Sequence, residues 1–324
     1  MANLRPKGKP TTGGENGKKQ TFEEQVCIVA GWLSLLTDGV FEIRALDVTP
    51  ANGGNWTHTE SGYFDRQHLT EAARTALQLT PRAKSVYVTL NALDDALLAR
   101  RCNRISKVKD GDATKDNEVT RRRWLYIDVD PVRPTNVSAT DEEKTAAREL
   151  VDQIREHLHE RGWPAPILGD SGNGNSLFYR VDLPKDNGGL VERCLKALAQ
   201  RFDNKRAHVD VSVNNPSRIV KVPGTLARKG DNAPEAGRPH RRSRLLAVPG
   251  CPDPRKVQGA ALEVALPNLL EELAAELKVE VPPVAAPSTN GVDAGGTGSG
   301  HRLNGQVPLH SERLCANTFR TVEG

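Results

Sequence analysis

The chain has 324 residues, of which 37% are apolar and 27% charged, with a formal net charge of +4. This composition suffices for a folded core and excludes wholesale disorder. The sequence contains no run of about 18 apolar residues, so it predicts no membrane-spanning helix. The five cysteines lie more than fifty residues apart and form no C-x-x-C pair, which argues against structural zinc and a disulfide framework and favours reduced thiols in the cytoplasm.

Basic residues gather in three segments, 1–20, 100–123 and 201–244. Such clustering favours a polyanionic partner, either nucleic acid or nucleotide. A plainer interpretation, in which these segments are solvated basic faces, stays open at this point.

Hydrophobic periodicity predicts strands that alternate with helices, and therefore a mixed α/β fold. We expect a long loop at 52–65 and an irregular segment at 105–120. The predicted helices are 22–36, 66–78, 94–103, a helix capped by Thr140 and Glu143 that closes at Gly162, 189–201, and 267–278. The predicted strands are 40–46, 85–90, 124–129, 177–181, 209–213, 218–222 and 244–248.

Composition also divides the chain. Residues 1–20 are expected to form a disordered basic tail, and 21–250 a core with lobes at about 21–120 and 121–250. A C-terminal helical segment is expected at 251–280. The stretch 281–324 is rich in Pro, Gly, Ser and Thr at its start, which is typical of a flexible linker or tail.

The strand at 124–129 ends in two paired acids, Asp128 and Asp130. Residues at i and i+2 of a strand face the same way, so both carboxylates should project from one face while Leu125, Ile127 and Val129 enter the core. Two adjacent carboxylates repel each other unless a cation lies between them. Hard oxygen ligands of this kind suit Mg²⁺ or Mn²⁺.

A second strand, 209–213, alternates in the same way and would deliver Asp210 as a third acid. Three acids from two strands would suit a two-metal site for phosphoryl transfer. Arg218 and Lys221 follow and supply charge for phosphates, as nucleotidyl transfer requires.

The stretch DSGNGNS at 170–176 places glycines at alternate positions between a helix and a strand. Such a segment can turn its backbone N–H groups toward an anion, although a simple tight turn explains it equally well. It is not a Walker A loop, because no G-K-[ST] follows, and none occurs elsewhere in the chain. An ATP-driven helicase is therefore not encoded here.

Taken together, IDVDP, DSGNGNSLFYRVDLP and VDVSVNNPSRIVKVPGT followed by RKG resemble the three motifs of the archaeo-eukaryotic primase superfamily. They look most like the primase-polymerases of bacterial phages and mobile elements. GVFEIRAL, SGYFD, YVTLN and LLARRCNR upstream are similar to the N-terminal lobe of that group. The resemblance covers about residues 40–248.

The resemblance implies two α/β lobes around a cleft, one of them similar to an RNA-recognition motif. It also implies a cytoplasmic DNA primase-polymerase that takes single-stranded DNA and NTP or dNTP, with two Mg²⁺ or Mn²⁺ ions, beside a separate helicase. By this resemblance Asp128, Asp130 and Asp210 are the catalytic metal ligands. The incoming nucleotide would contact Ser171, Gly172, Gly174, Ser176, Arg218 and Lys221. Weaker candidates for phosphate contacts are Arg100, Arg104, Arg228, Lys229, Arg238, His240 and Arg241.

One position departs from the superfamily pattern. Its second motif ends in a histidine that contacts nucleotide phosphates, whereas this chain has Ser176. A serine hydroxyl donates one hydrogen bond but carries no charge, so triphosphate binding should weaken. Two alternatives therefore stay open beside the polymerase, namely a catalytically degenerate module that binds single-stranded nucleic acid and a metal-dependent nuclease that uses the same acids.

Overall fold

The computed structural model describes residues 20–54, 56–109, 112–257 and 260–278, which belong to a folded unit that ends at Val279. The expected linker at 281–324 lies outside the described residues, as does the expected basic tail apart from Gln20. Within the described ranges, no helix combines the length and hydropathy needed to cross a bilayer.

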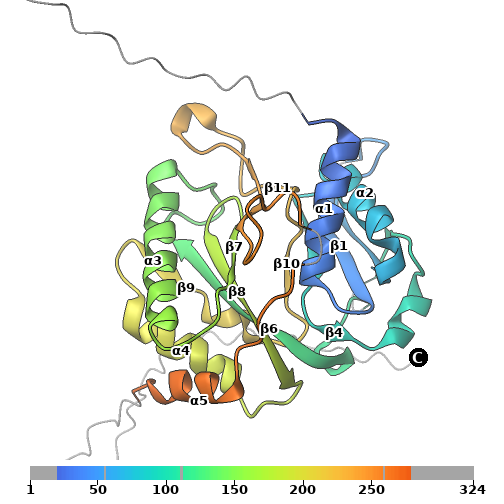
Figure 1. Cartoon of the computed structure of the whole chain (residues 1–324). Helices are drawn as coiled ribbons and strands as arrows, with labels where there is room; N and C mark the ends of the chain where they lie inside the picture. Colours follow the sequence, from blue (N-terminus) through green and yellow to red (C-terminus); the bar gives the residue numbers. More distant parts are fainter. Residues whose placement is uncertain (1–19, 55, 110–111, 258–259, 279–324) are drawn as a thin grey trace, which may run out of the picture. The chain divides into compact units, whose positions relative to one another are not determined.

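The first sheet is antiparallel. Its strand order is β10 (Ile219–Lys221), β3 (Ser85–Thr89), β1 (Phe41–Val48), β2 (His58–Phe64) and β5 (Ser106–Lys107). Helices α1 (Phe22–Leu36) and α2 (Leu69–Leu79) pack beside β1 (Figure 1). Ile43, Val86 and Val88 are fully buried in the resulting core. On the other face, Lys221, Tyr87, Arg44 and Ser61 form one row across four strands, because directly paired residues share a face.

The second sheet has the order β13 (Arg244–Ala247), β7 (Ile167–Asp170), β8 (Asn175–Pro184), β6 (Val119–Pro131) and β4 (Ala92–Leu93). β9 (Ala207–Val209) also pairs with β6. Helices α3 (Asp141–His159) and α4 (Leu190–Phe202) cover one face, and α5 (Pro267–Ala275) packs on α4. A short ladder joins β11 (Leu226–Ala227) to β12 (Arg241–Arg242). The predicted mixed α/β class is confirmed.

Local sequence signals fix the helix starts well. Helix α1 spans the predicted residues, and its capping box joins Thr21 to Glu24. The box predicted at Thr140 and Glu143 is present at the start of α3. Helix α5 begins at Pro267 as predicted but ends at Ala275. In each box the cap side chain satisfies a backbone N–H that the first helical turn leaves without a partner.

Several predictions were wrong where short side chains redirect the backbone. The strand predicted over 209–213 stops at Val209, because the Asp210 side chain accepts a hydrogen bond from Ser212 N at 2.9 Å and starts a 3₁₀ turn over Val211–Asn214. The helix predicted at 94–103 is a 3₁₀ helix over Asp95–Arg100. Both expected irregular stretches also contain strands, since β2 lies within 52–65 and β5 and the first residues of β6 lie within 105–120. Strand β7 was not predicted.

Candidate active site

The three predicted acids meet where β6 and β9 pair. Asp210 N donates to Asp128 O at 2.8 Å, directly beyond the ladder that pairs Val129 with Val209. Asp130 follows two residues after Asp128 on the same face of β6. On the opposite face Leu125, Ile127 and Val129 are fully buried, as predicted. We call Asp128, Asp130 and Asp210 the acidic cluster.

Asp128 has the most perturbed environment in the acidic cluster. Burial and the neighbouring Asp130 raise the pKa of its carboxyl to about 7. Lys221 opposes this change, Asp210 adds to it, and a hydrogen bond from the buried Tyr126 hydroxyl lowers the pKa again. Three carboxylates are therefore close enough to repel one another, which is the condition that a bound cation relieves.

Two lysines bring positive charge to the acidic cluster from outside the second sheet. Lys221 belongs to the first sheet, where its ammonium lies 5.6 Å from the centre of the Tyr87 ring. Lys229 follows β11. Burial lowers the pKa of Lys229, while the nearby Asp130 raises it. The polar faces of the two sheets thus meet at this point, with acids on one side and amines on the other.

The donor chemistry of the acidic cluster fits a hard divalent cation, because it consists of carboxylates. Among the residues that the structure describes, however, no three Asp, Glu, His or Cys side chains are grouped so that they could hold one ion. Two of the acids already have partners. Asp130 pairs with Arg133 at 3.2 Å, and Asp210 accepts from Ser212 N. A shared metal site would require these side chains to turn.

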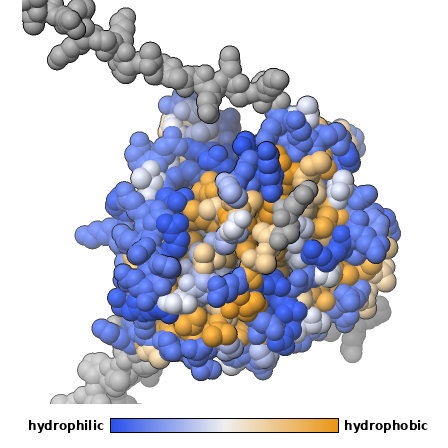
Figure 2. Space-filling model, viewed as in Figure 1, coloured by the Kyte–Doolittle hydropathy of each residue, from blue (hydrophilic) through white to orange (hydrophobic). Residues whose placement is uncertain are grey.

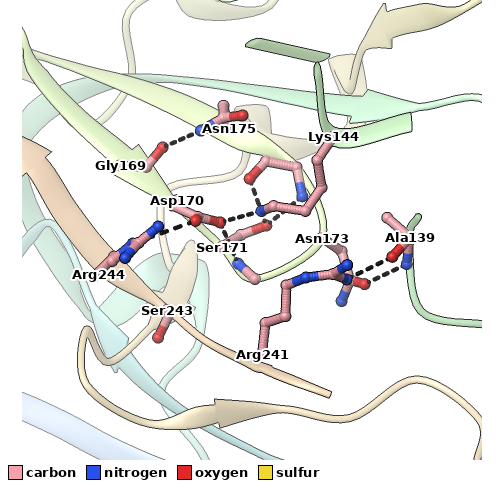
Figure 3. A network of polar contacts seen from close by, with 12 residues as sticks. Ala139, Lys144, Gly169, Asp170, Ser171, Asn173, Asn175, Arg241, Ser243 and Arg244 are labelled. Atoms are coloured by element: carbon pink, nitrogen blue, oxygen red, sulfur yellow. Dashed lines mark hydrogen bonds and ion pairs between the residues drawn. The ribbon is translucent and has the colours of Figure 1, made fainter. Parts of the chain in front are cut away.

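The glycine-rich segment is the hairpin turn between β7 and β8 rather than a link from helix to strand (Figure 3). Gly172 has a φ of +90°, which glycine adopts without strain and a type II′ hairpin turn uses. Its N–H donates to Asp170 Oδ1 at 2.8 Å, and Gly174 N donates to Ser171 Oγ at 3.0 Å. These predicted anion donors are thus already used inside the turn.

Gly174 has a packing role as well. A Cβ added there would lie 2.3 Å from Val129 O and 3.1 Å from an Asp130 carboxylate oxygen. Glycine at this position therefore lets the turn approach the strand that carries the acidic cluster.

Ser176 lies in the same cross-strand row as the acids. The ladders pair Asp128 with Ser176 and Ser176 with Gly169, so the side chains of Ser176 and Asp128 share a face. Ser176 is 3% exposed. A Cβ added to Gly169 would lie 2.8 Å from Ser176 Oγ, so the hydroxyl lies over Gly169 of the neighbouring strand β7.

Arg218 fastens the segment that follows the acidic cluster. Its guanidinium donates to Ser212 O at 2.9 Å and to Asn215 Oδ1 at 3.0 Å. Two further residues, which the sequence analysis did not select, bond the same segment at Asn214 and Ser217. Buried Arg122 donates to Asn214 O at 2.7 Å, and Asp116 accepts from Ser217 N at 2.8 Å. Asp210 therefore starts a segment anchored on both sides.

The basic stretch 228–242, which we call the arginine loop, is also occupied by internal contacts. Arg228 donates to the carbonyls of Thr80, Pro81 and Ala83 at the end of α2. Arg238 forms a two-pronged ion pair with Glu143. Arg241 makes similar contacts with Ala139 O and Asp141, and His240 with Gly230 O. Arg242 bonds one carbonyl, Gly224 O.

The two basic candidates upstream lie near β2. Arg100 pairs with Glu118 and contacts Tyr63 Oη at 3.4 Å. Arg104 is exposed.

Sequence reasoning missed Tyr126, Arg133 and Arg122. Tyr126 was within reach, because it lies two residues before Asp128 and must share its face. Arg122 gave no signal, since its role depends on a tertiary contact with Asn214, whereas the pair of Arg133 with Asp130, three residues apart, was overlooked.

No family model and no curated protein sequence matches this chain. Its structure is similar to that of the primase RepB′, with a TM-score of 0.42 and 10% identity over 78% of this chain and 63% of that one. The catalytic domain of RepB′ in complex with initiator DNA gives a TM-score of 0.39 and 10% identity over 78% and 95%. The polymerase domain of Mycobacterium tuberculosis ligase D, in complex with DNA, gives 0.35 and 14% over 79% and 89%. Two of these three structures are of a primase and one is of a polymerase domain.

Proposed function

We propose that the chain is a metal-dependent nucleotidyltransferase that copies a single-stranded DNA template, making and extending primers. The observation that carries the proposal is the convergence of three aspartates from β6 and the end of β9 with Lys221 and Lys229 facing them. Polar groups of both signs at the junction of two sheets match what phosphoryl transfer needs.

In this proposal each residue acts according to its position. Asp128, Asp130 and Asp210 would hold Mg²⁺ or Mn²⁺, which when bound would neutralise phosphate charge and activate the attacking oxygen. Lys221 and Lys229 balance the charge of the incoming triphosphate. Tyr126 orients the Asp128 carboxylate through its hydroxyl, which burial keeps protonated because it raises the Tyr126 pKa.

A second candidate is a degenerate module that binds nucleic acid without catalysis. Ser176 stands where a charged or strongly donating group is expected. In addition, the described side chains contain no ready group of three metal ligands. Both observations favour this alternative, and neither accounts for the two lysines opposite the acids.

One experiment separates these functions. The full chain is incubated with single-stranded DNA, labelled nucleotides and Mn²⁺, and the products are resolved by length. New or extended product supports the polymerase. A template that is bound but unchanged supports the binding module, and a shortened template indicates a nuclease. Asp128→Asn, which removes a charge at almost constant volume, is the control for contaminating activity.

A further inference from the structure

A large cavity lies beside the glycine turn, between α1 and β13. Its volume is about 1350 Å³, above the range of about 300–1000 Å³ usual for small-ligand sites. Hydrophobic residues gather in the middle of this face and hydrophilic residues surround them (Figure 2). The apolar wall of this α1–β13 cavity comes from Ile28, Val29, Trp32, Leu77, Leu245 and Leu246.

The rim of the α1–β13 cavity carries more positive than negative charge. Five cations line it, Lys144, Arg241, Arg242, Arg244 and Arg255, against three carboxylates, Asp141, Asp170 and Asp253. The difference is 5 − 3 = +2. The arginine loop and β13 supply most of these cations.

Two of these arginines account for the surplus. Arg242 is exposed, and within the described chain its guanidinium bonds a carbonyl, Gly224 O, at 2.7 Å rather than a carboxylate. Arg244 is 63% exposed and lies 3.5 Å from Asp170, which already pairs with Lys144 at 2.6 Å (Figure 3). Arg242 bonds a single carbonyl and Arg244 shares Asp170 with Lys144, so neither exposed guanidinium has a carboxylate of its own and both can bind an anion.

One residue of the α1–β13 cavity, Leu245, lies on the same face of the second sheet as Asp128. Leu245, Gly169, Ser176 and Asp128 form one cross-strand row. Three strand spacings separate Leu245 from Asp128, which is about 14 Å. An extended ligand that reaches the acids would thus have a neighbouring part at the cavity.

We infer that the α1–β13 cavity is a docking site for a single-stranded nucleic acid, with a base against the apolar wall and phosphates at Arg242 and Arg244. The inference rests on the proposed function, because it assigns a place to the strand on which the acidic cluster acts. Apolar surface combined with cations is the chemistry by which proteins hold unpaired strands.

Charge disfavours the nearest segment of the chain itself. Gln20 lines the cavity, and residues 1–19, which precede it, contain five Lys or Arg and one Glu. A segment of that composition would meet a rim of its own sign, whereas a phosphate backbone meets the opposite sign.

The test measures binding of a fluorescent oligothymidine to the full chain by anisotropy, over a range of salt, with a chelator and without nucleotide. The double variant Arg242→Ala/Arg244→Ala should bind the oligomer roughly tenfold more weakly. The slope of its log binding constant against log salt concentration should become shallower by about 1.4, or 0.7 for each lost phosphate contact. Arg148→Ala, on α3 and paired with Asp152, is the control and should change affinity less than about twofold.

The contribution of the apolar wall to binding is tested with two substitutions on helix α1. Ile28→Glu places a charge in the cavity, whereas Cys27→Glu places the same charge on the exposed side of α1. Only the first should weaken binding strongly, and an oligomer without bases should bind the wild type more weakly than oligothymidine. Oligouridine in parallel decides between DNA and RNA. Melting temperatures show that each variant is folded.

The inference is overturned if the folded double variant keeps the affinity and salt slope of the wild type, or if Ile28→Glu and Cys27→Glu behave alike. It is also overturned if deletion of residues 1–19 raises strand affinity, because the tail would then be the occupant. If the wild type binds the single-stranded oligomer but incorporates no nucleotide, the proposed polymerase is refuted, whereas the docking site is still supported.

Discussion

The charges of the acidic cluster repel one another, whereas most arginines of the arginine loop are bonded to other groups of the protein. In the acidic cluster, Asp128 and its acidic neighbours lie so close that their repulsion contributes to a raised pKa. In the arginine loop, Arg228, Arg238 and Arg241 each donate to carbonyls or carboxylates of the protein itself. Charges that the fold leaves uncompensated are available for a ligand, whereas charges that it pairs serve stability.

The largest expected effect is the loss of catalysis on removing any single member of the acidic cluster. Asp210→Ala should lower nucleotide incorporation by roughly a thousandfold or more, as should Asp128→Ala, because groups that act as one unit give non-additive losses. Primer extension with Mn²⁺ measures this effect. Full activity in Asp210→Ala beside an inactive Asp128→Ala would refute the three-acid site.

The same variants should keep their affinity for single-stranded DNA when a chelator is present. Removing a carboxylate leaves the cations in place and lowers the negative charge of the site, so anisotropy should show equal or tighter binding.

The next prediction concerns Ser176. Ser176→His would place a donor with a partial positive charge beside Asp128, next to Gly169 and the Phe178 ring. A charge-assisted contact with phosphate should lower the nucleotide KM by roughly tenfold. Because Ser176 is 3% exposed, the larger ring should also lower the melting temperature.

The control for this prediction is Ser176→Asn, which adds bulk without an imidazole. If both variants are folded and bind nucleotide no better than the wild type, Ser176 does not face the phosphates.

The sequence predicts those features of the acidic cluster that depend on neighbouring residues. The i and i+2 geometry of Asp128 and Asp130 follows from strand parity alone, and so does the burial of Ile127. Asp210 was assigned to the correct partner but to the wrong local structure, because its own side chain ends the strand.

The partners of the arginine loop were beyond local reasoning. Arg238 meets Glu143 across 95 residues, and Arg228 meets Ala83 across 145. No periodicity encodes such pairs, and the sequence therefore could not show that these cations also bond groups of the protein itself.

The pH dependence of stability offers a finer test of the acidic cluster. The folded-state pKa of Asp128 is about 7, above its ordinary value of 3.8, so the native state binds more protons than the unfolded state between these values. This carboxyl therefore makes the protein less stable as the pH rises from about 4 to about 7, and the loss is complete above that. Urea unfolding in a chelator should show the decline.

Asp128→Asn sharpens this test, because its side chain cannot ionise. The variant should lack this part of the pH dependence and should be more stable than the wild type at pH 8. Equal slopes in the two proteins would mean that the Asp128 carboxyl titrates as an ordinary exposed acid.

The smallest effect is expected in the arginine loop. Arg228→Ala removes the contacts to Thr80 O, Pro81 O and Ala83 O and leaves those carbonyls at the end of α2 without their partner. The cost should be about 1–3 kcal/mol of unfolding free energy, measured by urea denaturation. Strand affinity should change less than about twofold, because this guanidinium is already used by the fold. A tenfold loss of strand affinity in a variant of unchanged stability would reverse the assignment, and would make Arg228 a phosphate contact like those proposed for Arg242 and Arg244.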